Sequence, residues 1–145
     1  MLDILIVDND RVYIDFISQM LLKWGHRVES VETGRAARSL AWAENRFFGL
    51  VFLDIGLPDI PGYTLITEFK TKWDQTSIIA MTARSSIELE RKVRGYGIAY
   101  YMAKPFSVDE LTALVSHISR RQRGKHLPEQ SLSGCMIEKG PVVSE

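Results

Sequence analysis

The sequence predicts an α/β fold in which a doubly wound, five-stranded parallel sheet carries helices on both faces. Short apolar runs alternate along the chain with stretches that repeat apolar residues every three or four positions, as strands and helices do in such folds. The runs are apolar at consecutive positions, which is typical of parallel strands covered on both faces. Four of them end at a polar residue, namely Asp8, Asp54, Thr82 and Lys104. Because ligands of open α/β sheets bind beyond the carboxyl ends of the strands, we expect these four side chains on one rim.

The expected strands and helices alternate from the first residues onward. The strands are expected over residues 4–7, 26–31, 51–53, 78–81 and 100–103, and the helices over about 10–23, 33–45, 62–73, 86–94 and 107–121. The first helix has a stripe made of Tyr13, Phe16, Ile17, Met20, Leu21 and Trp24, the second buries Ala36, Ala37 and Leu40, and the third buries Leu65, Ile66, Phe69 and Trp73. Each stripe has helical spacing and predicts a face turned toward the sheet.

Residues with capping chemistry mark the helix ends. Gly25 ends the first helix and Thr33 begins the second. Ser85 and Ser107 each precede a glutamate by three residues, the spacing of a capping box in which hydroxyl and glutamate satisfy otherwise unpaired backbone N–H groups. We therefore expect Ser85 and Ser107 to cap the last two helices.

Composition limits the class of protein. A length of 145 residues with 46% hydrophobic residues suits one domain, here residues 1–122, followed by a polar tail, residues 123–145. The formal net charge of zero provides no overall field for nucleic acid or an anionic membrane. Cys135 is the sole cysteine, which excludes an intrachain disulfide. No signal peptide and no apolar run of roughly 18 residues is present, so we expect a cytoplasmic protein without a membrane partner.

The four rim residues have a common chemistry. Carboxylates at Asp8 and Asp54, brought together in a partly dry cleft, repel each other unless a cation intervenes. Mg²⁺ suits this role because it takes one or two carboxylates, keeps several waters and accepts phosphate oxygens. Thr82 offers a hydroxyl and Lys104 a positive charge to a phosphoryl group. Together these groups predict phosphoryl transfer to an aspartate.

These residues lie in motifs of a known family. The segments Ile6-Val7-Asp8-Asn9-Asp10, Leu53-Asp54-Ile55-Gly56-Leu57-Pro58-Asp59-Ile60-Pro61-Gly62, Met81-Thr82-Ala83 and Lys104-Pro105-Phe106 resemble the receiver domain of two-component response regulators. The resemblance covers about residues 1–122. It implies a flavodoxin-like sheet with strand order 2-1-3-4-5.

The resemblance also implies a role for each site residue. Asp54 would accept a phosphoryl group from a histidine kinase or a phosphotransfer protein. Asp8, Asp54 and the backbone carbonyl of Gly56 would hold Mg²⁺ or Mn²⁺. Thr82 and Lys104 would bind phosphoryl oxygens, Tyr101 would be an aromatic switch, and the Lys104-Pro105 peptide would be cis. The chain would then be a phosphoacceptor that assists its own phosphorylation and dephosphorylation, not an enzyme.

Asn9 departs from the usual pattern of the family, in which two acids follow the first strand. Its amide oxygen can coordinate a metal or hold a metal-bound water, but it supplies no charge. Asp10 offers a carboxylate nearby, although an aspartate at this boundary more often caps the following helix. We therefore expect weaker metal binding than at a site with two acids.

A phosphatase is the alternative from another class. Asp8-Asn9-Asp10-Arg11-Val12 fits the nucleophile motif of haloacid-dehalogenase-type phosphatases, with Asp8 and Asp10 in the leading roles. That class needs a further acidic pair after a strand beyond the lysine, and Asp109-Glu110 begins a helix instead. It also leaves Asp54 without a role, so we favour the receiver.

The segments outside the motifs indicate how the chain would signal. The tail is rich in Gly, Ser, Pro and charge, which predicts a linker or docking segment and not a complete output domain. A receiver–receiver dimer and an output domain in a longer protein both stay open. We do not expect nucleic acid to bind this chain itself, despite the basic residues at 120–125.

Overall fold

A parallel sheet with the strand order β2-β1-β3-β4-β5 forms the centre of the structure. The structure is a computed structural model, and it describes residues 1–124. Within these residues, the strands are β1 (Asp3–Val7), β2 (Arg27–Val31), β3 (Leu50–Asp54), β4 (Ser77–Thr82) and β5 (Tyr100–Ala103). The helices are α1 (Arg11–Lys23), α2 (Gly34–Trp42), α3 (Gly62–Lys72), α4 (Ile87–Arg94) and α5 (Val108–Gly124). The predicted fold class and strand order are confirmed.

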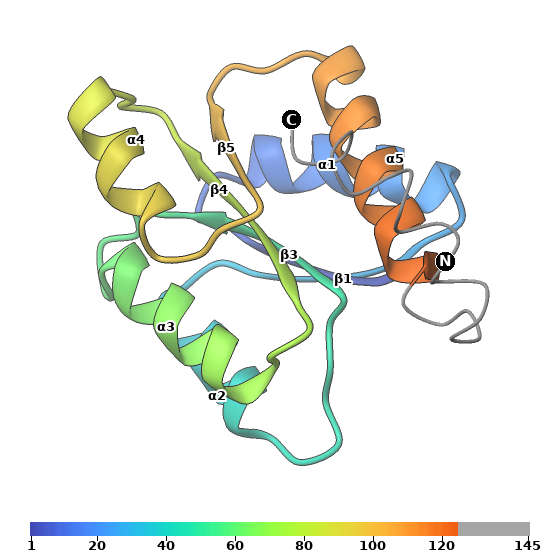
Figure 1. Cartoon of the computed structure of the whole chain (residues 1–145), viewed down its shortest axis with the longest axis horizontal. Helices are drawn as coiled ribbons and strands as arrows, with labels where there is room; N and C mark the ends of the chain where they lie inside the picture. The colour runs from blue at the N-terminus through green and yellow to red at the C-terminus, as the bar shows by residue number, and fades with distance from the viewer. Residues whose placement is uncertain (125–145) are drawn as a thin grey trace.

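Helices cover both faces of the sheet (Figure 1). Successive side chains of a strand point to opposite faces, so β1 contributes to two separate cores. Ile4 and Ile6 pack with the apolar side chains of α1 and α5. Leu5 and Val7 belong to the core that includes residues of α2, α3 and α4. This double burial explains why the strands are apolar at consecutive positions.

Two helix ends differ from the sequence prediction. Ser86, not Ser85, is the N-cap of α4, where its hydroxyl accepts a hydrogen bond from the Leu89 N–H at 3.0 Å. The helix α2 ends at Trp42, earlier than expected, because the chain then becomes extended and reaches a left-handed conformation at Asn45 (φ 61°). Ser107 caps α5 as predicted, accepting from the Glu110 N–H at 3.1 Å.

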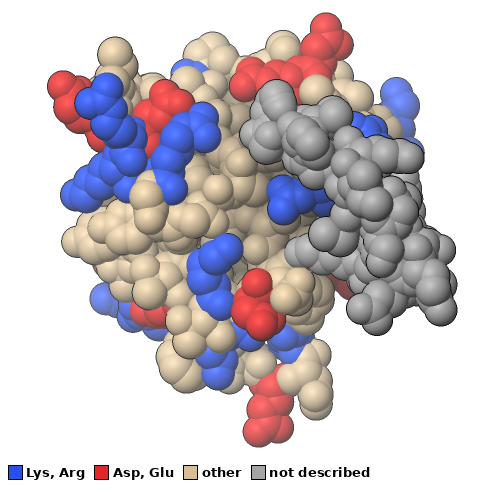
Figure 2. All heavy atoms as spheres, in the orientation of Figure 1, with Lys and Arg blue, Asp and Glu red and all other residues tan. Residues whose placement is uncertain are grey.

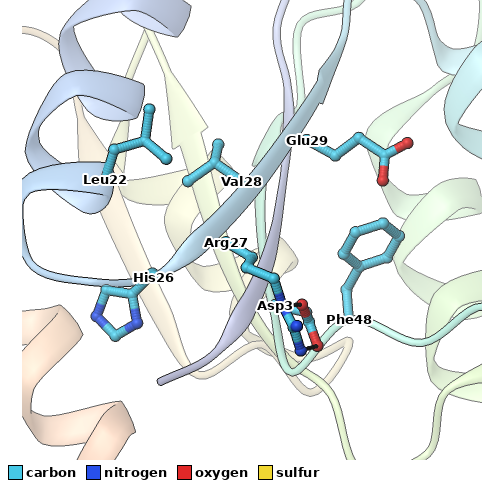
Figure 3. A pocket seen from close by; sticks show the side chains of 7 residues that line it. All are labelled: Asp3, Leu22, His26, Arg27, Val28, Glu29 and Phe48. Atoms are coloured by element: carbon cyan, nitrogen blue, oxygen red, sulfur yellow. Dashed lines mark hydrogen bonds and ion pairs between the residues drawn. The ribbon is translucent and has the colours of Figure 1, made fainter.

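The amino ends of the strands lie far from the predicted rim and carry a different set of polar contacts. Figure 3 shows a pocket there, lined in part by Asp3, His26 and Arg27. Arg27 forms an ion pair with Asp3, and the Nδ1 of His26 accepts a hydrogen bond from the Leu2 N–H. Burial of His26 lowers the pKa of its imidazole, which favours this neutral acceptor form. These contacts anchor β2 at the start of the sheet.

Helix α4 makes few contacts with the rest of the fold. Val93 is its one buried residue, and Leu89 packs partly against the same core. The Tyr96 ring that follows α4 stacks on the Tyr63 ring at the start of α3, with 5.8 Å between the ring centroids. Among residues 1–124, no helix combines the length and the apolar character needed to cross a membrane.

Candidate functional site

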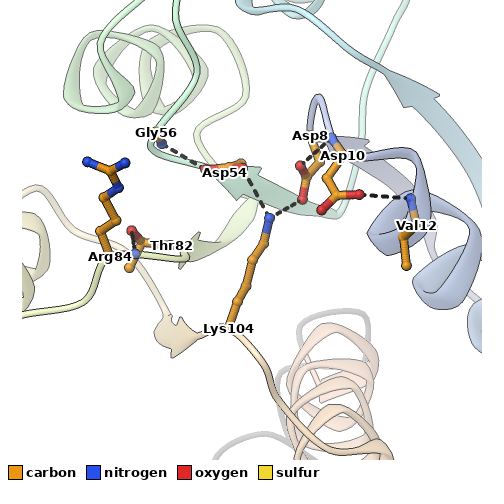
Figure 4. A network of polar contacts seen from close by, with 8 residues as sticks. All are labelled: Asp8, Asp10, Val12, Asp54, Gly56, Thr82, Arg84 and Lys104. Carbon is orange, nitrogen blue, oxygen red and sulfur yellow. Dashed lines mark hydrogen bonds and ion pairs between the residues drawn. The ribbon is translucent and has the colours of Figure 1, made fainter.

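The four polar residues that end the apolar runs lie at the carboxyl edge of the sheet. Asp54 and Thr82 are the last residues of β3 and β4, whereas Asp8 and Lys104 follow directly after β1 and β5. Figure 4 shows Asp8, Asp54 and Lys104 joined in one network, with Thr82 beside them on the neighbouring strand. The strand register places Asp54 opposite Met81, one residue before Thr82. Residues separated by almost a hundred positions are thus brought together by the topology of the sheet.

The ammonium group of Lys104 bridges the two carboxylates. Its Nζ donates to Asp8 Oδ2 at 2.6 Å and to Asp54 Oδ2 at 3.1 Å. Asp8 is fully buried, and the side chains of Asp54 and Lys104 are 11% and 5% exposed. Asp54 is therefore the carboxylate of this pair that solvent and a ligand can reach. The Lys104-Pro105 peptide is cis, as the resemblance implied.

Burial and charge act in opposite directions on this network. Burial raises the pKa of the Asp8 carboxyl, an effect that the hydrogen bond from Lys104 opposes. Burial alone would lower the pKa of Lys104, but its hydrogen bond with Asp8 and the charge of Asp54 raise that pKa above its ordinary value. Lys104 is therefore a protonated, positively charged group that faces two acids.

The second oxygen of Asp54 is held by the backbone. Gly56 donates its N–H to Asp54 Oδ1 at 2.7 Å, so both oxygens of this carboxylate are oriented. A Cβ atom at position 56 would lie 3.3 Å from Asp54 Oδ1, closer than ordinary van der Waals contact. A residue without a side chain therefore suits position 56 and leaves the carboxylate approachable.

Thr82 is buried at the edge of the site, and its Oγ1 accepts a hydrogen bond from the Arg84 N–H at 3.0 Å. The switch candidate Tyr101 is half-buried on β5, and its hydroxyl lies 2.9 Å from Ser85 Oγ. Ser85, which was predicted to cap a helix, is thus a partner of Tyr101. The hydroxyls of Thr82 and Tyr101 both bond to the loop between β4 and α4.

Asp8, Asn9 and Asp10 follow β1 and have different roles. Asp10 caps α1, because its Oδ1 accepts from the Val12 N–H at 3.0 Å. Its own N–H donates to Asp8 Oδ1 at 2.9 Å, which orients the buried acid. Asn9 between them is exposed. The interpretation of Asp10 as a helix cap is confirmed.

The oxygen donors at this rim fit a hard divalent cation. Asp8 and Asp54 provide two carboxylates, and Mg²⁺ requires only one or two together with water and phosphate oxygens. The described residues contain no cluster of three or more His, Cys, Asp or Glu side chains able to hold a metal. Side-chain carboxylates alone therefore do not complete a coordination sphere here, which leaves positions for a backbone carbonyl and water.

Sequence reasoning missed Tyr13 as a neighbour of the site. We assigned it to the apolar stripe of the first helix, but its ring lies beside Lys104, with 4.3 Å from Nζ to the ring centroid. The available signal was an aromatic residue in the first turn of the helix that follows Asp8, at the carboxyl edge of the sheet.

Comparison with known proteins agrees with the fold. The family model of the response regulator receiver domain matches residues 4–116. The chain therefore belongs to the response regulator receiver domain family, and it is a phosphoacceptor module of two-component signal transduction.

Individual relatives support the same assignment. The response regulator protein FleR of Pseudomonas aeruginosa is 30% identical over 142 residues, which cover 98% of this chain and 28% of FleR. A BeF3-activated receiver domain of DrrB superposes with a TM-score of 0.75 at 30% identity, covering 83% of this chain and 98% of that domain. A response regulator from Burkholderia pseudomallei, with a phosphorylated aspartic acid and a calcium ion, shares the fold at 24% identity (TM-score 0.71, 86% of this chain and 72% of that one). The chain spans 28% to 64% of the first curated relatives it matches.

Proposed function

We propose that Asp54 is the phosphoacceptor and that it takes a phosphoryl group from the phosphohistidine of a kinase or a phosphotransfer protein. The observation that carries this proposal is the shared Lys104, whose ammonium bonds both the buried Asp8 and the accessible Asp54. Among the site carboxylates, Asp8 is enclosed and Asp10 caps a helix. Asp54 is left as the nucleophile.

In the reaction, one Asp54 carboxylate oxygen attacks the phosphorus atom while the bond from phosphorus to the histidine nitrogen breaks. The N–H of Gly56 holds the carboxylate in orientation. The ammonium group of Lys104 changes its hydrogen-bond partner from a carboxylate to a phosphoryl oxygen and neutralises the negative charge of that oxygen. Thr82 turns its hydroxyl toward another phosphoryl oxygen. Asp8, Asp54 and the Gly56 carbonyl, with Asn9 or its water near by, would hold Mg²⁺ or Mn²⁺, and the ion would supply further charge neutralisation.

The rest of the assignment follows from this role. The chain accepts a phosphoryl group and assists its own phosphorylation and dephosphorylation without turning over a separate substrate. Residues 1–122 form the receiver, and the tail of residues 123–145 lies largely outside the described residues. The partners are a histidine kinase or phosphotransfer protein in the cytoplasm, and a second receiver or an output domain. Tyr101 serves as the switch of the interaction surface.

Phosphorylation by acetyl phosphate with Mg²⁺ tests the proposal. Intact mass should rise by one phosphoryl group, and Asp54→Asn should abolish the increase. Asp59→Asn changes an exposed acid on the same loop and is the matched control, which should be modified like the parent. Equal modification of Asp54→Asn and the parent would contradict the assignment. Sustained hydrolysis of p-nitrophenyl phosphate would instead support the phosphatase alternative with Asp8 and Asp10.

A further inference from the structure

The ammonium group of Lys104 is enclosed by an aromatic ring as well as by two acids. Asp8 and Asp54 accept two of its N–H bonds. The face of Tyr13 covers a further side, with 4.3 Å between Nζ and the ring centroid. A cation within about 6 Å of a ring centroid is attracted by the negative face of the ring. Tyr13 is thus a direct electrostatic partner of the lysine.

The position of the Tyr13 ring is fixed from two elements. Tyr13 lies in the first turn of α1, and its ring centroid is 5.6 Å from that of Phe106. Phe106 also contacts Phe16, one turn further along α1, at 6.0 Å. Since Phe106 follows Lys104 by two residues, the segment that carries the lysine is packed against the same helix that supplies the ring. The Tyr13 ring and the Lys104 ammonium group therefore have a fixed position relative to each other.

This packing limits the paths open to the lysine. The ammonium must leave a carboxylate and reach a phosphoryl oxygen during the proposed reaction. The Tyr13 ring of α1 attracts the ammonium, so Lys104 can stay in contact with the ring while it changes its oxygen partner. An aliphatic residue at position 13 would fill space without attracting the ammonium. The hydroxyl of Tyr13 has no part in this effect, because the ring face makes the contact.

We propose that Tyr13 is a positioning residue that orients Lys104 toward the phosphoryl group through its ring face. The proposal rests on the proposed function of Asp54 as the phosphoacceptor. It concerns a residue whose contribution comes entirely from its contact with another residue, since Tyr13 itself does not touch the reacting atoms.

The first test compares variants by their rate constant for phosphorylation with acetyl phosphate and Mg²⁺. Tyr13→Leu should react about tenfold more slowly than the parent, whereas Tyr13→Phe, which keeps the ring, should react within about twofold. Trp42→Leu is the matched control, because it removes another cation–π pair, with Lys72 Nζ 4.2 Å from the ring centroid, on the exposed end of α2. This control should react like the parent.

The second test separates electrostatics from packing. Phenylalanine analogues with one, two or three fluorine atoms at position 13 preserve the shape of the ring while weakening its negative face. The rate constant should fall stepwise along this series, and a purely structural role would leave it flat. The methylene protons of Lys104 should show an upfield ring-current shift in the NMR spectra of the parent and Tyr13→Phe, and lose it in Tyr13→Leu.

Distinct outcomes identify which proposal fails. If the parent is modified at Asp54 and Tyr13→Leu reacts equally fast, the role of Tyr13 is wrong and the function of Asp54 stands. A flat fluorination series also overturns the role of Tyr13, even if Tyr13→Leu is slow through misfolding. If the parent is not modified at Asp54, the proposed function fails and the role of Tyr13 in it fails as well.

Discussion

The hydroxyl groups of Ser85 and Tyr101 lie 2.9 Å apart and connect the loop after β4 to strand β5. The Arg94 guanidinium of α4 lies 6.0 Å from the centroid of the same tyrosine ring. At the other end of the loop, Thr82 Oγ1 accepts the Arg84 N–H. One short loop thus bonds both the hydroxyl predicted to contact the phosphoryl group and the aromatic residue predicted to switch.

The hydrogen bond between Ser85 and Tyr101 predicts that the Tyr101 switch favours its unphosphorylated state. This hydrogen bond stabilises the position that the Tyr101 hydroxyl has in the structure, so Ser85→Ala should release the ring and favour the phosphorylated state. A neutral hydrogen bond contributes about 1 kcal/mol, so the affinity for BeF3 with Mg²⁺ should rise about two- to fivefold. Tryptophan or tyrosine fluorescence during a BeF3 titration measures this change.

Ser86→Ala provides the comparison at the neighbouring position. Ser86 caps α4, so this variant should lose about 1 kcal/mol of unfolding free energy without the same gain in BeF3 affinity. A Ser85→Ala protein that binds BeF3 no more tightly than the parent would show that the bond does not restrain Tyr101.

The error at these two serines shows where sequence reasoning reaches its limit. Both Ser85 and Ser86 have capping chemistry, and local spacing favoured Ser85 because Glu88 follows three residues later. The deciding contact is the one to Tyr101, sixteen residues away on another strand. By contrast, the order of the strands and the rim of Asp8, Asp54 and Lys104 follow from the alternation of elements and the family motifs. The contact of Tyr13 with Lys104 was missed because helical spacing explains Tyr13 equally well as part of an apolar stripe.

The asparagine at position 9 predicts weak Mg²⁺ binding, and the substitution Asn9→Asp should strengthen it. Asn9→Asp adds a negative charge on the exposed residue beside Asp8, so Mg²⁺ affinity should rise about three- to tenfold. Fluorescence titration with Mg²⁺ measures the affinity of the parent and of Asn9→Asp. Asp10→Asn is the matched variant, because asparagine caps a helix as well as aspartate does while the charge is removed. If Asp10→Asn weakens Mg²⁺ binding and Asn9→Asp does not tighten it, Asp10 already supplies the missing charge.

Asp59 predicts a pH dependence of stability. Its carboxylate accepts the N–H groups of Arg35 and Gly34 at 2.9 and 3.0 Å and so joins the loop after β3 to the start of α2. These hydrogen bonds lower the pKa of the Asp59 carboxyl from its usual 3.8. A lowered folded-state pKa means that the stabilisation is complete above pH 3.8 and is lost as the pH falls through the folded-state value.

The melting temperature of Asp59→Ala tests that dependence. The variant should melt below the parent at pH 7, and the difference should shrink as the pH is lowered below 3.8. Asp74→Ala, which removes an exposed acid without a hydrogen bond or an ion pair among the described residues, should show little difference at either pH. A constant difference between Asp59→Ala and the parent across this range would mean that the charge of Asp59 is not what stabilises the loop.

The surface around α4 predicts activation-dependent self-association. Figure 2 shows basic side chains gathered at the corner that α4 occupies in Figure 1, and the last turn of α4 carries Arg91, Lys92 and Arg94 while its first turn carries Glu88 and Glu90. A helix with an acidic start and a basic end is complementary to a second copy of itself in antiparallel orientation. Because α4 is held by few buried residues, a movement of Thr82 and Tyr101 can shift it at small cost.

Sedimentation velocity with and without BeF3 and Mg²⁺ measures that association. The parent should shift toward a larger species on activation, and Thr82→Ala should not, although Asp54 of this variant is still phosphorylated by acetyl phosphate. Thr82→Ser keeps the hydroxyl and should associate like the parent, which separates the loss of the hydrogen-bonding group from a general disturbance of β4. Equal association of activated Thr82→Ala and the parent would show that the coupling between Asp54 and the α4 surface does not pass through Thr82.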